Sequence, residues 1–205
     1  MRKPTGPGDT PIVGIAGWKK SGKTMLTIGL IEELARRGLK VATVKHAHHA
    51  FDVDTGSTDS ARHRKAGARE VAIVSKLRWA MVGELAGQAE PDFRDVVQWF
   101  RPCDLIIVEG YKTAPIPKIE TRRTDAFEHT PLSPRDPFVV AIAADHRVAD
   151  AEVPVFDLSD ILGIADFLTA YLGLSRLAAT SKPLRVRKPR RGKGVRGKSI
   201  VKSET

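Results

Sequence analysis

Residues 17–24 constrain this chain more than any other feature, because they complete the pattern G-x-x-x-x-G-K-[ST] between two segments of different periodicity. The continuous apolar segment 12–16 before them is typical of a short strand. After them, apolar residues recur at helical spacing until Gly38, which favours the end of a helix. The arrangement predicts a strand, a phosphate-binding loop and a helix, in that order. The loop consists of Gly17, Trp18, Lys19, Lys20, Ser21, Gly22, Lys23 and Thr24.

Each residue type in this loop suits the binding of nucleotide phosphates. Glycines allow backbone N–H groups to turn inward around phosphate oxygens, and the start of the following helix adds the positive end of its dipole. In this pattern the lysine, here Lys23, reaches the β- and γ-phosphates, and the hydroxyl of Thr24 binds Mg²⁺. We therefore expect residues 17–24 to bind a nucleotide with Mg²⁺, and Lys23 to act in catalysis.

The rest of the core alternates between strand-like and helix-like segments. This alternation favours an α/β fold of the P-loop nucleotide-binding class, with three layers and a mostly parallel, doubly wound sheet. In such sheets ligands bind beyond the carboxyl ends of the strands. Helices are predicted over 59–67, 94–100 and 160–172, the last capped by Ser159. Strands are predicted over 40–44, 70–75, 105–108, 138–143 and 154–156, and an edge strand over 117–121.

Two acidic residues follow predicted strands at that end of the sheet. Glu109 ends an apolar run, as in a Walker B strand, although Asp is the commoner residue there. A carboxylate at this place holds Mg²⁺ through water or positions the attacking water, so we assign Glu109 to catalysis and to the metal site. Asp145 follows a later buried strand, where a carboxylate can bind the N1–H and N2 amine of guanine. The full Asn-Lys-x-Asp motif is absent, which leaves guanine preference open.

A cluster of histidines follows the predicted strand 40–44. Neutral imidazoles are common ligands of transition metals, so one interpretation is a metal site. The alternatives are a loop that faces phosphate or a second substrate, and ordinary surface histidines. The residues concerned are Lys45, His46, His48, His49, Asp52 and Asp54.

Further basic and aromatic residues are candidates for a pocket that takes a second, anionic ligand. The alternative is that the aromatic residues pack and the lysines are solvated. The candidates are Arg78 with Trp79, Lys112 with Tyr111, and the segment from Lys118 to Glu120.

The net charge of +10 is concentrated at one end of the chain. Residues 181–205 hold ten Lys and Arg against one acidic residue, and prolines and glycines interrupt them. Such a segment cannot bury enough apolar surface to fold alone. We expect a flexible N-terminus over 1–10, a nucleotide-binding domain over 11–174 and a basic disordered tail over 175–205. The tail either contacts nucleic acid or an acidic partner, or is simply solvated.

The remaining composition bounds the compartment and the cofactor chemistry. A single cysteine, Cys103, excludes an internal disulfide and a zinc cage built from cysteines, and its place before an apolar run favours a core position. No segment reaches the roughly 20 apolar residues of a membrane-spanning helix. We expect a soluble protein of the cytoplasm.

The combination of these motifs over about residues 11–172 resembles one family, the molybdopterin-guanine dinucleotide biosynthesis protein B family, MobB. The resemblance rests on the order and spacing of several segments. They are the phosphate-binding loop, the cluster 45–49 followed by 52–54, the pair 59–60 with 64–68, the segment 78–80, and the run 105–112.

The resemblance implies a homodimeric GTP-binding adaptor with weak GTPase activity. It would assist the guanylyltransferase that joins GMP to molybdopterin, so nucleotidyl transfer itself is expected in the partner enzyme. It also implies that residues 17–24 bind GTP phosphates with Mg²⁺ and that Glu109 is the Walker B acid. Related dimeric proteins often carry a second lysine directly after the first glycine, for use across the dimer. Here Trp18 has that place, so Lys19 or Lys20 would have to substitute.

Two other functions stay open on the sequence. A P-loop kinase of small metabolites would need a general base and usually an arginine-rich lid. A metallochaperone GTPase would need a thiolate or histidine trap, for which only Cys103 and the histidines of 46–49 are present.

Overall fold

A computed structural model describes residues 5–47, 58–149 and 151–174 of the chain. The basic segment 175–205 and four of the candidate residues, His48, His49, Asp52 and Asp54, lie outside the described residues. The elements are η1 Pro7–Asp9, β1 Ile12–Ala16, α1 Lys23–Arg36, β2 Val41–Lys45, α2 Asp59–Lys65, β3 Glu70–Val74, β4 Trp79–Gly83, α3 Phe93–Gln98, β5 Leu105–Glu109, β6 Lys118–Arg122, β7 Val139–Ala144, β8 Val155–Asp157 and α4 Ile161–Leu172.

The main sheet confirms the predicted parallel, doubly wound arrangement. Its strand order is β2-β5-β1-β6-β7-β8, and every pair in it is parallel. The prediction of an edge strand over 117–121 is wrong, because β6 lies between β1 and β7. Charged residues such as Lys118 and Glu120 are more typical of an edge strand than of a central one. Both are only 1% exposed, and ion pairs with Asp136 and Arg122 compensate their charges inside the protein.

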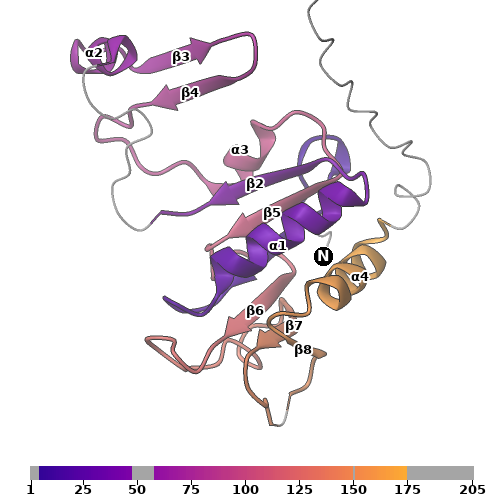
Figure 1. Cartoon of the computed structure of the whole chain (residues 1–205). Coiled ribbons are helices and arrows are strands. Elements are labelled where there is room, and N and C mark those ends of the chain that lie inside the picture. Colours follow the sequence, from indigo (N-terminus) through magenta and orange to yellow (C-terminus); the bar gives the residue numbers. More distant parts are fainter. Residues whose placement is uncertain (1–4, 48–57, 150, 175–205) are drawn as a thin grey trace, which may run out of the picture.

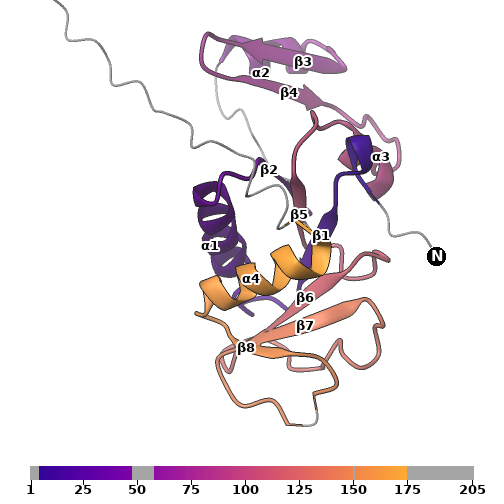
Figure 2. The ribbon, with the colours of Figure 1, turned by 90° about the vertical axis from the view of Figure 1, so that its right-hand side faces the viewer.

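Helices cover both faces of this sheet (Figures 1 and 2). α1 and α4 pack side by side on one face, where Leu30 and Leu168 join a buried cluster with alternate residues of the strands. On the other face, α3 contributes Phe93 and Val97 to a second cluster. β1 is buried along its whole length, as a strand covered on both faces should be. The carboxyl end of this buried strand leads directly into the phosphate-binding loop.

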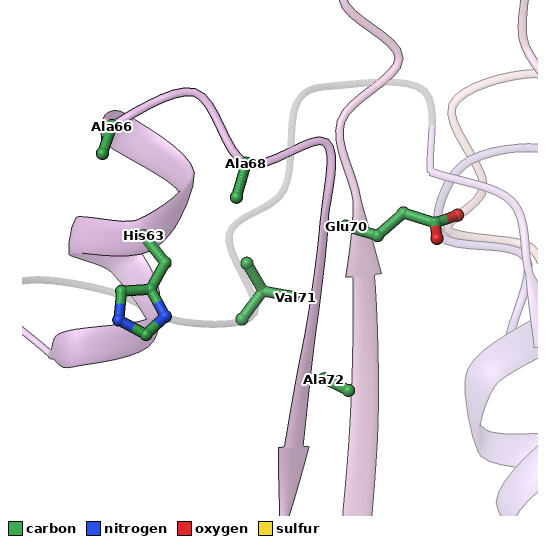
Figure 3. Close-up of a pocket in the computed structure, with 6 residues that line it drawn as sticks. All are labelled: His63, Ala66, Ala68, Glu70, Val71 and Ala72. Carbon is green, nitrogen blue, oxygen red and sulfur yellow. The ribbon is translucent and has the colours of Figure 1, made fainter.

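A two-stranded antiparallel sheet stands apart from the main sheet (Figure 1). Its first strand, β3, confirms the predicted strand over 70–75, but that strand does not join the parallel sheet. Its second strand, β4, was not predicted. α2 packs against β3, and a pocket of about 490 Å³ lies between them (Figure 3). Val71 points toward α2 and Glu70 away from it, among the lining residues His63, Ala66, Ala68, Glu70, Val71 and Ala72.

The ends of the elements follow local chemistry. α1 is followed by Gly38, whose φ of 89° suits glycine, as the sequence predicts. The cap of α4 is not Ser159 but Asp160, whose carboxylate accepts a hydrogen bond from the Gly163 N–H. Of the segment 1–10, expected to be flexible, Gly6 and Thr10 are buried and the Thr10 hydroxyl donates a hydrogen bond to the carbonyl of Cys103, whereas Gly8 and Asp9 are exposed. In the part of the chain that is described, no helix is long and apolar enough to cross a membrane.

Candidate nucleotide-binding site

The loop between β1 and α1 has the backbone that a phosphate cradle requires. Gly17 has a φ of 150°, and a Cβ there would lie 2.5 Å from Oγ1 of Thr121. Gly22 has a φ of 92°, and a Cβ there would lie 2.7 Å from a methyl group of Leu158. Only glycine fits both places, because the conformation and the space each exclude a side chain. The loop is also fixed from β6, since the hydroxyls of Ser21 and Thr121 lie 2.7 Å apart.

The N-terminus of α1 opens into this cradle. Its cap residue is Gly22, and within the described residues no side chain caps the first turn. A helix end of this kind presents free backbone N–H groups and a positive dipole end to an anion. The Lys23 ammonium donates hydrogen bonds to the carbonyls of Gly17 and Trp18, at 3.1 and 2.7 Å. The Lys23 side chain therefore extends back over the loop, and its ammonium lies where phosphate oxygens would bind.

Thr24 and Glu109 are in direct contact. The Thr24 hydroxyl donates a hydrogen bond to Oε1 of Glu109 at 2.8 Å, and the same carboxylate oxygen lies 3.5 Å from the Lys45 ammonium. Glu109 is 8% exposed at the end of β5, while Asp104 lies before the start of that strand. A hydroxyl and a carboxylate side by side are oxygen ligands of the kind that Mg²⁺ prefers. The structure thus brings together the two residues that the sequence assigned to Mg²⁺.

The lysines around this centre interact electrostatically. Burial lowers the pKa of Lys23, the charge of Glu109 opposes that change, and the charges of Lys112 and Lys45 lower the pKa further. The charges of Glu109, Lys112 and Lys45 thus all act on Lys23. An excess of positive charge at a helix N-terminus fits the binding of a polyanion such as a nucleoside triphosphate.

Trp18 and Lys112 form a contact that sequence reasoning did not foresee. The Lys112 ammonium lies 3.5 Å from the centroid of the Trp18 ring, and the indole N–H donates a hydrogen bond to the carbonyl of Thr130 at 2.7 Å. Neither Thr130 nor Thr121 belongs to a motif, and no periodicity marks them. Only the fold reveals them, because it places β6, with Thr121, and the segment 123–137, with Thr130, beside the loop.

Lys19 and Lys20 point to another neighbour. Their ammonium groups lie 5.4 and 4.7 Å from the ring centroid of Phe127, which is itself 65% exposed. The backbone N–H of Phe127 donates to the carbonyl of Lys19 at 3.1 Å. Within one chain, both lysines therefore interact with the segment after β6.

Asp145 lies just after β7, as predicted, but its carboxylate already accepts several hydrogen bonds. Hydrogen bonds from the His146 ring and from the backbone and hydroxyl of Thr124 hold the pKa of Asp145 at about 2. Arg123 lies 3.6 Å from the same carboxylate. A guanine base would have to share this acceptor with the protein's own donors.

The candidates for a second ligand separate in the structure. Lys45 and His46 lie beside Glu109, and Nε2 of His46 is 3.0 Å from a carboxylate oxygen of Glu90. Arg78 instead lies in the turn between β3 and β4, next to Trp79, whose ring faces Arg101 before β5. The described residues therefore do not bring Arg78 to Lys112. Within 5–47, 58–149 and 151–174, no group of His, Cys, Asp and Glu side chains is suited to hold a metal ion.

Lys118 and Glu120, considered for the same pocket, are structural instead. The Lys118 ammonium donates to the carbonyls of Lys112 and Ala114 and to Asp136. Glu120 accepts hydrogen bonds from Arg122 and from the backbone N–H groups of residues 132 and 133. Cys103, expected in the core, is half-buried, and burial raises the pKa of its thiol.

Comparison with known proteins agrees with this architecture. A family model described as "Molybdopterin guanine dinucleotide synthesis protein B" (MobB) matches residues 12–145. The molybdopterin-guanine dinucleotide biosynthesis adapter protein of Escherichia coli (strain K12) is 35% identical over 164 residues, which cover 79% of this chain and 93% of that protein. The adapter protein of Haemophilus influenzae (strain ATCC 51907 / DSM 11121 / KW20 / Rd) is 36% identical and covers 79% of this chain and 89% of its own length.

Solved structures share the fold. The crystal structure of Bacillus subtilis MobB has a TM-score of 0.60 at 21% identity, covering 78% of this chain and 96% of that chain. The MobB homologue from Bacillus stearothermophilus has a TM-score of 0.58 at 22% identity, covering 80% of this chain and 98% of that chain. The family model spans most of the described core, including the phosphate-binding loop, Glu109 and Asp145. This chain therefore belongs to the molybdopterin guanine dinucleotide synthesis protein B family, MobB.

Proposed function

We propose that this protein is a GTP-binding adaptor with slow GTPase activity that assists the attachment of GMP to molybdopterin. The observation that carries the nucleotide part is the 2.8 Å hydrogen bond between Thr24 and Glu109, which joins the phosphate-binding loop to the acid of β5. The pathway comes from the family, whose relatives are named molybdopterin-guanine dinucleotide biosynthesis adapter proteins. The partner would be the guanylyltransferase, which performs the nucleotidyl transfer.

Different groups of the loop and of its neighbours would bind the phosphates and the Mg²⁺ of GTP. The first-turn N–H groups of α1 and the Lys23 ammonium bind phosphate oxygens, and the glycines leave room for them. Thr24 and Glu109 would hold Mg²⁺, directly or through water. Mg²⁺ in such a site neutralises charge on the β- and γ-phosphates. Glu109 also has the place from which a carboxylate positions an attacking water.

The cations around the described part of the site support slow hydrolysis. Those next to Thr24 and Glu109 are the lysines Lys23 and Lys45. Arg123 lies close to Gly22 of the loop, but its guanidinium is paired with Asp145. An arginine finger can raise the hydrolysis rate by roughly 10³–10⁵. Among the described residues, no arginine contacts Thr24 or Glu109, and on this basis we expect a protein that presents GTP rather than one that consumes it quickly.

Nucleotide-dependent stabilisation tests the binding step. With Mg²⁺, GTP should raise the melting temperature of the wild type, because a ligand that binds only the native state stabilises it by mass action. ATP should raise it less, because a site that prefers guanine binds ATP more weakly. Lys23→Ala should lose this shift and bind GTP at least about tenfold more weakly, a loss of about 1.4 kcal/mol. Equal shifts with wild type and Lys23→Ala would contradict the proposal.

Reconstituted guanylyl transfer tests the adaptor step. The partner guanylyltransferase, molybdopterin and limiting GTP are assayed with and without this protein. We expect stimulation by the wild type and none by Lys23→Ala. No stimulation, or equal stimulation by both proteins, would refute a GTP-dependent adaptor role.

The small sheet supports the further proposal of a homodimer. Val74, Trp79 and Met81 lie on one face of β3 and β4, and their side chains are 76%, 55% and 59% exposed. α2 packs on the opposite face, toward which Val71 points, so this face is an apolar patch of the kind that marks protein–protein contacts. A second copy carries the same apolar face and would cover it symmetrically.

Light scattering of the purified protein checks this contact. The wild type should have the mass of a dimer, and Val74→Glu with Met81→Glu should have the mass of a monomer. Thr43→Glu, at an exposed position of β2, is the control and should stay dimeric. A monomeric wild type would contradict the dimer, and a dimeric double variant would place the contact elsewhere.

A further inference from the structure

Lys112 is placed beside the phosphate-binding loop by two separate anchors. Its carbonyl accepts a hydrogen bond from the Lys118 ammonium at 2.7 Å, and Lys118 is 1% exposed. The Lys118 ammonium also donates hydrogen bonds to the carbonyl of Ala114 at 2.8 Å and to the carboxylate of Asp136 at 2.6 Å. The short loop after β5 is therefore held in place by a central strand. The backbone that carries Lys112 is therefore held from inside the protein.

The side chain of Lys112 is held as well. Its ammonium lies 3.5 Å from the Trp18 ring centroid, over the second residue of the phosphate-binding loop. The Trp18 ring cannot turn freely, because its N–H donates to the carbonyl of Thr130 at 2.7 Å. A cation held against an aromatic face is attracted by the ring quadrupole, which fixes its position without neutralising its charge.

Lys112 and Lys23 contact the same residue of the loop. The half-buried Lys112 lies against the Trp18 ring, and the Lys23 ammonium donates to the Trp18 carbonyl at 2.7 Å. The positive charge of Lys112 contributes to lowering the pKa of Lys23. Glu109, the nearby carboxylate, is engaged by Thr24 and Lys45. Two ammonium groups at one loop repel each other, so a structure that anchors both favours a ligand that carries several negative charges.

We propose that Lys112 is a second phosphate-binding lysine, which contacts the terminal phosphate of a bound nucleoside triphosphate from within the same chain. This inference rests on the proposed binding of GTP. It assigns Lys112 to the nucleotide and not to a separate anionic ligand. The terminal phosphate is the expected target, because Lys112 follows Glu109 closely in sequence, and Glu109 and Thr24 mark the Mg²⁺ end of the site.

Discrimination between triphosphate and diphosphate tests the proposal. Lys112→Met should weaken the binding of a non-hydrolysable GTP analogue with Mg²⁺ by about tenfold or more. Binding of GDP should change by less than about twofold, so the preference for the triphosphate falls. Lys112→Arg keeps the charge and can stack on indole, and it should keep most of the preference. Lys65→Met removes an exposed lysine at the end of α2 and serves as the control for net charge.

The outcomes separate this proposal from the function on which it rests. If the wild type binds neither nucleotide, the proposed function fails. If the wild type binds both and Lys112→Met keeps the triphosphate preference, or loses both nucleotides equally, the role of Lys112 is overturned. A melting temperature near that of the wild type shows that Lys112→Met is folded; if it is not folded, Lys112→Gln and Lys112→Arg give the same comparison. Unchanged preference with lost stimulation of guanylyl transfer would assign Lys112 to the second ligand instead.

Discussion

Two charged side chains in the middle of a parallel sheet, Lys118 and Glu120, hold the loops near the candidate nucleotide site. On the face opposite α1 and α4, β6 is covered by chain segments whose backbone groups bond to these side chains. Each buried charge is paired and hydrogen-bonded, which is the condition under which a charge is tolerated inside a protein. These residues therefore replace a layer of apolar packing with directional bonds.

Removing the Lys118 charge should destabilise the whole protein. In Lys118→Met, Asp136 and two carbonyl oxygens lose their donor, and we expect the free energy of unfolding to fall by about 3 kcal/mol. Urea denaturation at neutral pH measures the change. Lys65→Met, at an exposed position, should change it by less than about 0.5 kcal/mol. A Lys118→Met protein as stable as this control would show that the bonds contribute little.

Glu109→Gln should separate nucleotide binding from hydrolysis. The amide keeps the shape of the side chain and can still accept the Thr24 hydrogen bond, but it loses the charge that organises Mg²⁺ and water. We expect retained GTP binding and a phosphate-release rate at least about tenfold lower, equivalent to about 1.4 kcal/mol in the barrier. The control is Asp104→Asn, since Asp104 lies at the opposite end of the same strand and should leave hydrolysis unchanged. Equal rates in Glu109→Gln and wild type would remove Glu109 from catalysis.

At the scale of elements, the pairing of α1 with α4 includes a charged link. Glu33 accepts hydrogen bonds from Arg36 and Arg37, and Arg37 also contacts Asp166 of α4 at 2.6 Å. Hydrogen bonds from Arg36 and then Arg37 lower the pKa of Glu33 to about 2, from an ordinary value of 4.5. Because the folded state favours the ionised form, the stability from Glu33 is present above about pH 4.5 and is lost as the pH falls toward 2.

This linkage predicts an effect that depends on pH. Glu33→Gln should be less stable than the wild type at pH 7, and the difference should shrink as the pH falls from about 4.5 toward 2. Chemical denaturation over this range measures the difference. Glu32→Gln changes the neighbouring exposed carboxylate and should show a smaller effect at pH 7. A difference that stays constant with pH would contradict the role given to Glu33.

Elements with a strong local signal could be predicted from the sequence, and their neighbours in space could not. The loop 17–24 and the run 105–109 gave both ends of the Thr24–Glu109 contact, because each motif needs its residues at fixed spacing. The place of β6 in the centre was missed, since the compensation of Lys118 by Asp136 is visible only after folding. β4 was missed because its partner β3 was assigned to the main sheet. Trp18 and Lys112 were both candidate site residues, but no pattern in the sequence indicates that their side chains are in contact.

At the scale of the whole molecule, positive charge is concentrated at one end of the chain. Residues 181–205 hold ten of the 34 Lys and Arg residues against one acidic residue, and prolines and glycines interrupt them, a composition that cannot bury enough apolar surface to fold alone. Truncation after Ser181 should therefore leave the melting temperature and GTP binding nearly unchanged. The same truncation should remove most of the salt-dependent retention on heparin, because that retention depends on the release of counterions. Loss of nucleotide binding on truncation would show that the tail contributes to the fold.

The strand order has a consequence for how this protein is made. β1 leaves the ribosome early but lies between β5 and β6. Ile12 can pair with Ile106, and Gly14 with Lys118, only after those later strands have been synthesised. Until those partners emerge, a wholly apolar strand and the inner face of α1 have no sheet to join, and such long-range pairing is slow. Glu109 and Thr121, which fix the phosphate-binding loop, arrive with the same two strands. A nascent chain that ends before β6 therefore carries the complete motif of residues 17–24 without the Thr121 contact that holds the loop in place.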